Sequence, residues 1–265
     1  MGTKAEYPAG RAATAHRWEE LAPGVLRRRL PGWDATVGVI TGPAGVLLVD
    51  TGSSLREGAE LRTEVRELVG RPVTHIALTH PHFDHVFGTA AFAGAEVYGP
   101  HGIETVLTRD REELRDDATR HGLPREEAAE AADVLVAPQR LVAGEWTVDL
   151  GGGREVLLAN LGPAHSGHDL VVLVPGTDLS AHGNHSPKGT SGLRQHAPVV
   201  FCGDLVEESG VPQAGPDAHP ARWPGALDKL LELAGDDALY VPGHGAVVDA
   251  AFVRRQRAEL AAGLD

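Results

Sequence analysis

The sequence contains one cysteine, Cys202, and one methionine among its 265 residues. Without a second thiol the chain cannot form an internal disulfide, and its cysteine usage gives no sign of an oxidising compartment. No apolar run reaches the roughly 18 residues of a membrane-spanning helix, and the first 20 residues lack the apolar segment of a signal peptide. We therefore expect a cytoplasmic protein that does not bind membranes.

Positive charge is also scarce. The 24 Lys and Arg residues are outnumbered by 37 Asp and Glu residues, which leaves a formal net charge of −13. Non-specific affinity for nucleic acids comes from cations that neutralise phosphates, so we do not expect a nucleic-acid partner. The only basic run, Arg27-Arg28-Arg29, lies in a predicted strand. We expect a small-molecule substrate, and the sequence leaves the oligomeric state open.

The apolar residues, 42% of the chain, are enough to build a substantial core, and no change in composition divides the sequence. We predict a loose N-terminal arm over 1–20 and a single domain over 21–265. Apolar patterns and Gly/Pro turns predict strands over 25–30, 35–41, 46–50, 73–79, 95–98, 141–142, 146–150, 155–159, 170–174, 199–202 and 239–241. Helices are predicted over 55–69, 86–92, 109–132, 223–233 and 250–264.

This order of elements predicts an α/β fold with two mixed β-sheets stacked face to face and helices outside, a four-layer αββα sandwich.

Two segments of the chain are strongly charged or polar. The blocks of Arg, Glu and Asp over 109–132 are most simply a solvated helix face, interrupted near Gly122-Leu123-Pro124. The polar, Gly/Ser-rich segment 176–198 predicts a flexible insertion, and the role of its histidines stays open.

A cluster of metal-binding side chains follows the predicted strand over 73–79. The segment His80-Pro81-His82-Phe83-Asp84-His85 places three imidazoles and a carboxylate within six residues. These groups bind borderline-soft divalent metals. Alternate residues of extended backbone point to the same side, so His80 and His82 can bind one ion while Asp84 and His85 face a second. The motif therefore predicts two metal ions.

Three further candidate ligands, each after a predicted strand, follow later in the sequence: His165, Asp204 and His244. Glycines lie beside each of them and let the side chain approach a common centre. We interpret His168 as a turn residue and Cys202 as a small buried thiol, and expect neither to bind the metal.

With these motifs in order, the chain resembles the metallo-β-lactamase superfamily of metal-dependent hydrolases. The resemblance covers roughly Val25 to Val248 and includes the segment Leu48-Val49-Asp50-Thr51-Gly52. It implies a first metal site formed by His80, His82 and His165. It implies a second site formed by Asp84, His85 and His244. It further implies that Asp204 bridges the two metals and that Asp50 hydrogen-bonds a ligand to fix its orientation.

The resemblance also implies the chemistry. Two Zn²⁺ ions per chain are the expected cofactor, with iron or manganese as alternatives. The metals would hold a bridging hydroxide that attacks the carbonyl of an ester, thioester, lactone or lactam. Asp84 is our candidate to orient the hydroxide and pass its proton to the leaving group. Trp33 and Phe83 are candidates for an apolar wall beside the substrate.

Departures from known branches of the superfamily leave the substrate unassigned. Zinc β-lactamases typically have Cys or Ser in place of Asp204, which leaves at most a weak β-lactamase. Acyl-homoserine lactonases have Tyr where this chain has Glu207. The flavodiiron branch has an acid in place of His82. One alternative is a mononuclear iron dioxygenase acting on a persulfide, which would depend on His80, His165 and Asp204.

Overall fold

The computed structural model describes residues 17–176 and 196–263. Most of the segments predicted as the loose arm (1–20) and the flexible insertion (176–198) lie outside the described residues. Among the helices in the described part of the chain, none combines the length and the apolar character needed to cross a bilayer.

In the described part of the chain the first sheet contains seven strands, and their spatial order follows the sequence. They are β1 (Glu19–Ala22), β2 (Val25–Arg29), β3 (Thr36–Thr41), β4 (Val46–Val49), β5 (His75–Ala77), β6 (Glu96–Pro100) and β7 (Arg140–Val142). Strands β1 to β4 pair antiparallel, and β4 to β7 pair parallel. Strand β1 was not predicted, and regular structure starts at Glu19, six residues before the first predicted strand.

The second sheet contains five strands in the order β12-β11-β10-β9-β8. They are β8 (Glu145–Asp149), β9 (Glu155–Asn160), β10 (Leu170–Val174), β11 (Val199–Phe201) and β12 (Leu239–Val241). Only β11 and β12 pair parallel, and the other neighbours are antiparallel. Both sheets are therefore mixed, as predicted.

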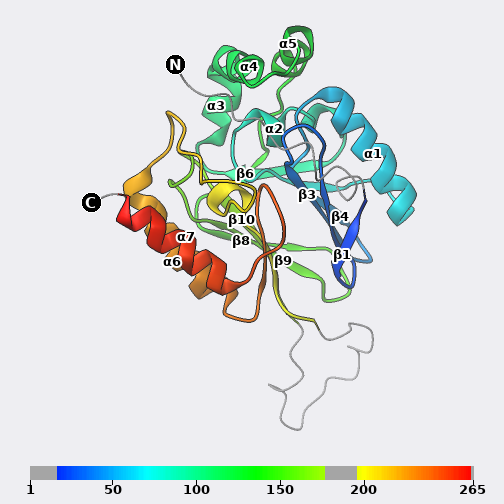
Figure 1. Cartoon of the computed structure of the whole chain (residues 1–265). Coiled ribbons are helices and arrows are strands. Elements are labelled where there is room, and N and C mark those ends of the chain that lie inside the picture. The colour runs from blue at the N-terminus through cyan, green and yellow to red at the C-terminus, as the bar shows by residue number, and fades with distance from the viewer. Residues whose placement is uncertain (1–16, 177–195, 264–265) are drawn as a thin grey trace.

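Helices cover the outer face of each sheet (Figure 1). The first sheet is covered by α1 (Leu55–Val69), α2 (Phe83–Val86), α3 (Ile103–Arg109), α4 (Arg111–Arg120) and α5 (Arg125–Asp133). The second sheet is covered by α6 (Trp223–Ala234) and α7 (Ala250–Ala262). Short 3₁₀ helices span Thr89–Ala91, Gly203–Leu205 and Pro220–Arg222. The predicted helix over 109–132 is divided into α4 and α5 near Gly122, as its sequence indicated.

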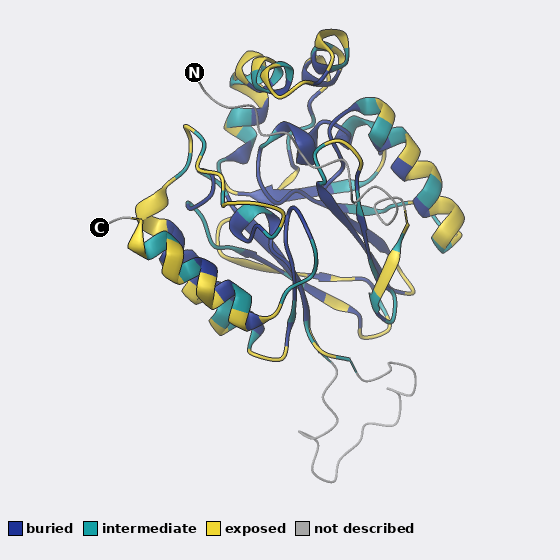
Figure 2. Cartoon of the chain, in the orientation of Figure 1, coloured by how far each residue is buried: buried dark blue, intermediate teal, exposed yellow. Residues whose placement is uncertain are grey.

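Three hydrophobic cores separate the four layers, and strand periodicity explains them. In β4, Leu47 and Val49 face the core between the sheets, whereas Val46 and Leu48 face the core under α1. Strand β10 likewise divides its residues between the core between the sheets and the core under α6 and α7. Strands that are covered on both faces are continuously apolar. Figure 2 shows these buried strands in the interior, and the helices outside them have exposed outer faces. The four-layer αββα sandwich is confirmed.

The two sheets approach closely where β3 of the first sheet faces β11 of the second. A Cβ atom added to Gly38 would lie 2.4 Å from a ring carbon of Phe201, well inside contact distance. We predict that Gly38→Ala lowers the free energy of unfolding by about 1–3 kcal/mol because it overpacks this core. Denaturant unfolding measures the effect.

Gly225 provides the matched control, since it lies on the exposed face of α6 and its added Cβ would meet no atom within 4 Å. Gly225→Ala should leave stability unchanged or raise it by about 0.5–1 kcal/mol, as expected for a helical position. Equal stability of the two variants would contradict the close sheet contact.

Candidate metal centre

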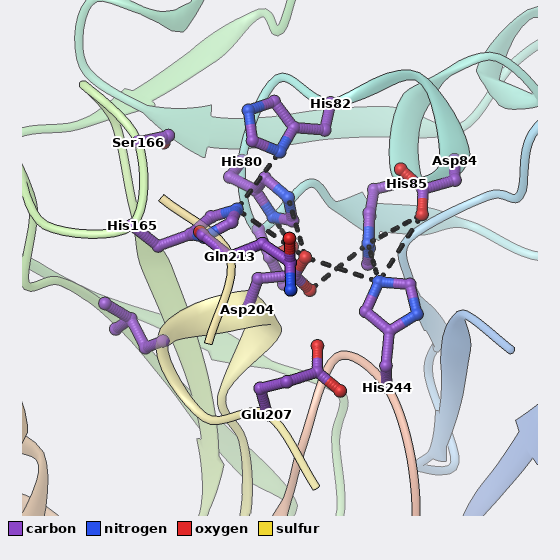
Figure 3. Close-up of polar contacts among 12 residues, drawn as sticks. His80, His82, Asp84, His85, His165, Ser166, Asp204, Glu207, Gln213 and His244 are labelled. Atoms are coloured by element: carbon purple, nitrogen blue, oxygen red, sulfur yellow. Dashed lines mark hydrogen bonds and ion pairs between the residues drawn. The ribbon is translucent and has the colours of Figure 1, made fainter. Parts of the chain in front are cut away.

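The carboxyl ends of several strands meet at one edge of the sandwich. Strands β4 and β5 are parallel neighbours, and the pairings of the second sheet make β9, β11 and β12 run in one direction. Asp50 follows β4, the HxHxDH segment follows β5, and His165, Asp204 and His244 follow β9, β11 and β12. Side chains from both sheets thus converge on one centre (Figure 3).

The first group of candidate ligands contains His80, His82, His165 and Asp204, with ligand atoms within 4.8 Å of one another. His165 Nε2 lies 3.0 Å from His82 Nδ1 and 3.5 Å from Asp204 Oδ2. His80 Nε2 lies 3.7 Å from the same carboxylate oxygen. The structure therefore brings together the residues predicted for the first metal.

The second group contains Asp84, His85 and His244, again within 4.8 Å. His85 Nε2 and His244 Nε2 are 3.4 Å apart, and Asp84 Oδ2 lies 3.4 Å from the latter. Asp84 and His85 lie on α2, which begins at Phe83 and so turns both side chains towards β12. This is the predicted second set.

Asp204 lies between the two groups (Figure 3). Its Oδ2 is 3.3 Å from His244 Nε2, and its Oδ1 is 3.3 Å from His85 Nε2, while Oδ2 also faces the first group. A Cβ on Gly243 would lie 1.8 Å from Asp204 Oδ1, so only glycine leaves room for the carboxylate. This position is the one expected for the bridging role that the resemblance implies.

Each of the five histidines has one ring nitrogen held by an outer partner and the other facing the centre. The outer contacts are His80 Nδ1 to Thr79 Oγ1 (2.9 Å), His82 Nε2 to Asp217 (3.2 Å), His85 Nδ1 to Asp50 Oδ2 (2.8 Å), His165 Nδ1 to the Gln213 carbonyl (3.1 Å) and His244 Nδ1 to the Trp33 carbonyl (2.8 Å). Such partners orient metal-binding imidazoles and select their tautomer. The other ring nitrogen of each histidine faces the common centre, where it can bind a metal ion.

Asp50 orients two of these histidines, His85 directly and His80 through Thr79. Its Oδ2 accepts hydrogen bonds from His85 Nδ1 and from Thr79 Oγ1, and Oδ1 accepts from the Thr79 backbone N–H. Because the Thr79 hydroxyl donates to Asp50, its oxygen can accept the His80 Nδ1–H. Asp50 has a φ of 57°, a conformation that costs energy for a non-glycine residue. The structure places Asp50 in the orienting position implied by the resemblance.

Sequence reasoning missed four outer partners: Thr79, Asp217, the Gln213 carbonyl and the Trp33 carbonyl. Gln213 and Asp217 belong to the loop between the 3₁₀ helices Gly203–Leu205 and Pro220–Arg222, which has no periodic pattern. A backbone carbonyl leaves no mark on residue identity. Thr79 could have been suspected, since it directly precedes the HxHxDH segment.

Burial and mutual charge set the protonation of the ligands. Burial lowers the pKa of His165 to about 4 and that of His80 well below its usual value, so both are neutral at pH 7. Burial also opposes charge on His244, but Asp204 outweighs it and raises the pKa of His244 to about 10. The pKa of Asp204 is held well below its usual range, because the surrounding histidines outweigh the cost of burial.

Glu207 is a further buried acid beside this centre. Its carboxylate forms a third group with Asp204 and His244, and one of its oxygens accepts hydrogen bonds from the backbone and hydroxyl of Ser209. Burial raises the pKa of Glu207 to about 7. Sequence comparison singled out this position but assigned it no contact with the centre.

The remaining predicted residues lie around the centre. Trp33 and Phe83 pack edge to face, with ring centroids 5.2 Å apart, and both line a cavity above the ligands. His168 Nδ1 contacts the His101 carbonyl and stays outside the ligand groups. Cys202 is buried, and burial raises the pKa of its thiol strongly. The interpretation of Cys202 as a small buried thiol is therefore confirmed.

The donor set fits a divalent metal. His80 Nε2 and Asp204 Oδ1 are buried and have no hydrogen-bond partner among the residues that the structure describes. Buried polar atoms normally have one, and both atoms lie at the point where the inward nitrogens converge. Imidazole and carboxylate are ligands of first-row divalent metals. Fold and site together define an αββα sandwich with a histidine and aspartate cluster suited to metal.

The comparison with known families agrees. The family model described as the metallo-beta-lactamase superfamily matches residues 30–244, and the chain belongs to this superfamily. Metallo-beta-lactamase domain-containing protein 1 of Xenopus laevis is 27% identical over 214 residues, which cover 80% of this chain and 71% of that protein. The linear primary-alkylsulfatase of Pseudomonas sp. (strain ATCC 19151) is 36% identical over 58 residues, only 22% of this chain and 11% of that protein.

Solved structures show the same fold. A metallo-beta-lactamase from Pontibacter korlensis superposes with a TM-score of 0.64 and 20% identity, covering 92% of this chain and 98% of that one. A metallo beta lactamase from Hirschia baltica superposes with a TM-score of 0.59 and 17% identity, covering 92% and 97%. At these identities the similarity establishes the fold alone.

Asp217 offers a test of the outer hydrogen bonds. We predict that Asp217→Ala weakens metal binding at the first group by about 10- to 100-fold, because His82 loses the partner that orients its ring. Competition with a chromogenic chelator measures the affinity. Asp116→Ala, an exposed acid on α4, is the control and should bind as the wild type does. Unchanged affinity in Asp217→Ala would contradict the orienting role.

Proposed function

We propose that this protein is a two-zinc hydrolase in which a hydroxide attacks the carbonyl carbon of a small ester, thioester, lactone or lactam, and the acyl C–O, C–S or C–N bond breaks. The observation that carries the proposal is the position of Asp204 between two complete ligand groups. One group alone would suffice for a single metal. The second group, with its own carboxylate and two histidines, has no use in a one-metal site, which favours the hydrolase over a mononuclear iron dioxygenase.

Zinc is the metal that best suits the donors. The first group offers three imidazoles and a carboxylate, and the second offers two imidazoles with Asp84 and Asp204, with no thiolate in either. When bound, zinc lowers the pKa of a coordinated water to about 7 and polarises a carbonyl oxygen. Geometry, ligand type and metal availability select among first-row metals more than raw affinity does, and elemental analysis of the purified protein identifies the metal.

The chain's own residues supply proton handling. The side chain of Asp84 is 11% exposed, lies on α2 at the floor of the cavity and places Oδ2 3.4 Å from His244 Nε2. From this position its carboxylate can accept a hydrogen bond from the attacking water and deliver that proton to the leaving group. The apolar rings of Trp33 and Phe83 border the same floor and limit the access of bulk water.

The relatives' names do not decide the substrate. The alkylsulfatase matches only 58 residues of this chain, and a match of that length does not transfer its reaction to this protein. The name of the Xenopus laevis relative states no substrate. The proposal therefore stays at the level of carbonyl hydrolysis, and a small-molecule substrate is proposed because the cavity has a volume of about 500 Å³.

A hydrolysis panel tests the reaction. We expect the zinc-loaded protein to cleave at least one of four substrates, namely a β-lactam, a thioester, a lactone and a phosphodiester, with the carbonyl compounds preferred. Asp84→Asn should lower kcat by at least about 100-fold through loss of proton transfer. Metal content measured on the same sample separates this loss from loss of zinc. No turnover of any substrate, or full activity in Asp84→Asn, would contradict the proposal.

Metal removal tests the cofactor. Dialysis against a chelator should abolish hydrolysis, and about two equivalents of Zn²⁺ per chain should restore it. Elemental analysis of the protein as purified distinguishes the alternatives, because the persulfide dioxygenase requires one iron. Activity that survives complete removal of metal would exclude both.

A further inference from the structure

The cavity above the candidate ligands has an unusual wall. Part of its lining is apolar and contains Trp33, Phe83, Val106 and Leu114. Another part comes from α4 and its N-terminal flank, where Asp110, Glu113 and Asp117 are spaced three to four residues apart. The charged pattern over 109–132, which the sequence indicated to be a solvated face, thus borders the cavity along part of its length.

The charge of this wall is predominantly negative. Arg120 is the only Lys or Arg among the described residues that line the cavity, and its guanidinium lies 2.9 Å from Asp117 with 66% of the side chain exposed. Asp217 also lines the cavity and pairs with His82. Asp110 and Glu113 have no cationic partner within the described part of the chain. Two uncompensated carboxylates therefore border the cavity.

The same cavity reaches the candidate metal centre. Asp204 lines it, and Asp204 Oδ1 is buried without a hydrogen-bond partner among the described residues. The acidic residues of α4 therefore border the cavity that contains the centre and are not an isolated surface patch. The charges of the metal centre interact with the reacting carbonyl group. The carboxylates of α4 and its N-terminal flank interact with the part of the substrate that lies farther from the centre.

We propose that this cavity selects carbonyl substrates that carry a positively charged group beside an apolar group, and that it disfavours anionic substrates. The inference rests on the proposed hydrolase function and specifies its substrate class. A cleft lined by one sign of charge raises the local concentration and association rate of the opposite charge by about 10- to 1000-fold. Asp110 and Glu113 are the residues that determine this preference, and Trp33 and Leu114 receive the apolar portion.

Three phenyl esters of nearly equal size test the preference. They are the esters of 4-(trimethylammonio)butyrate, of its neutral carbon isostere 5,5-dimethylhexanoate, and of glutarate, whose far end is a carboxylate. At pH 8 and low ionic strength we expect kcat/KM of the zinc-loaded protein to be about 10- to 100-fold higher for the cationic ester than for the anionic one. In 1 M salt, where the Debye length is about 3 Å, the ratio should shrink to a few-fold.

Matched double variants locate the charge. Asp110→Asn with Glu113→Gln should reduce the ratio of cationic to anionic kcat/KM by about tenfold at low salt. Glu112→Gln with Asp116→Asn removes the same charge from the same helix, but neither residue lines the cavity, so the wild-type ratio is expected. A wild-type ratio near one, or equal ratios in the two double variants, would overturn the proposal.

Binding measurements separate this proposal from the proposed function. The corresponding anilides react much more slowly, and their affinity for the metal-free protein can be measured by calorimetry. We expect the cationic anilide to bind more tightly than the anionic one, and the Asp110 and Glu113 double variant to lose this difference. If no ester is hydrolysed but the difference in binding is present, the hydrolase proposal fails while the charge preference stands. The reverse result would overturn the charge preference alone.

Discussion

The carboxylate of Asp204 is the constraint on which the rest of the site depends. It lies buried between inward-facing nitrogens of four histidines, at 3.3 to 3.7 Å from each. A buried carboxylate is costly unless it is paired, and here the compensating groups come from both sheets. The fold therefore has to hold β5, β9, β11 and β12 in fixed relation for this one charge to be accommodated. The packing around this carboxylate is tight, because any side chain at position 243 would overlap Asp204 Oδ1.

The outer hydrogen bonds turn this arrangement into a defined set of ligands. Asp50 orients His85 directly and His80 through Thr79, whereas backbone carbonyls orient His165 and His244. The strained φ of Asp50 is maintained because β4 and β5 are buried on both faces and cannot relax. Stability of the sandwich and geometry of the site are thus linked through the strand ends.

Much of this could be predicted from the sequence, for a physical reason. Strands with two covered faces are continuously apolar, so the layers were recognisable. The HxHxDH segment is visible without a structure, and the resemblance assigned ligand roles to His165, Asp204 and His244, which the structure brings into the same two groups. Strand β1 was missed because its residues, Glu-Glu-Leu-Ala, do not alternate. Asp217 was missed because a loop contact has no spacing rule. Glu113 on α4 is exposed, in agreement with a solvated face, but its place beside the cavity could not be predicted, because an acidic residue has the same polar character whether it faces bulk water or a cavity.

If the two ligand groups joined by Asp204 hold two zinc ions, anomalous diffraction from crystals of the purified protein, collected on either side of the zinc absorption edge, will locate both. We expect two zinc peaks, one bordered by His80, His82 and His165 and the other by Asp84, His85 and His244, with Asp204 reaching both. A single peak, or a signal at the iron edge in place of zinc, would contradict the two-zinc proposal.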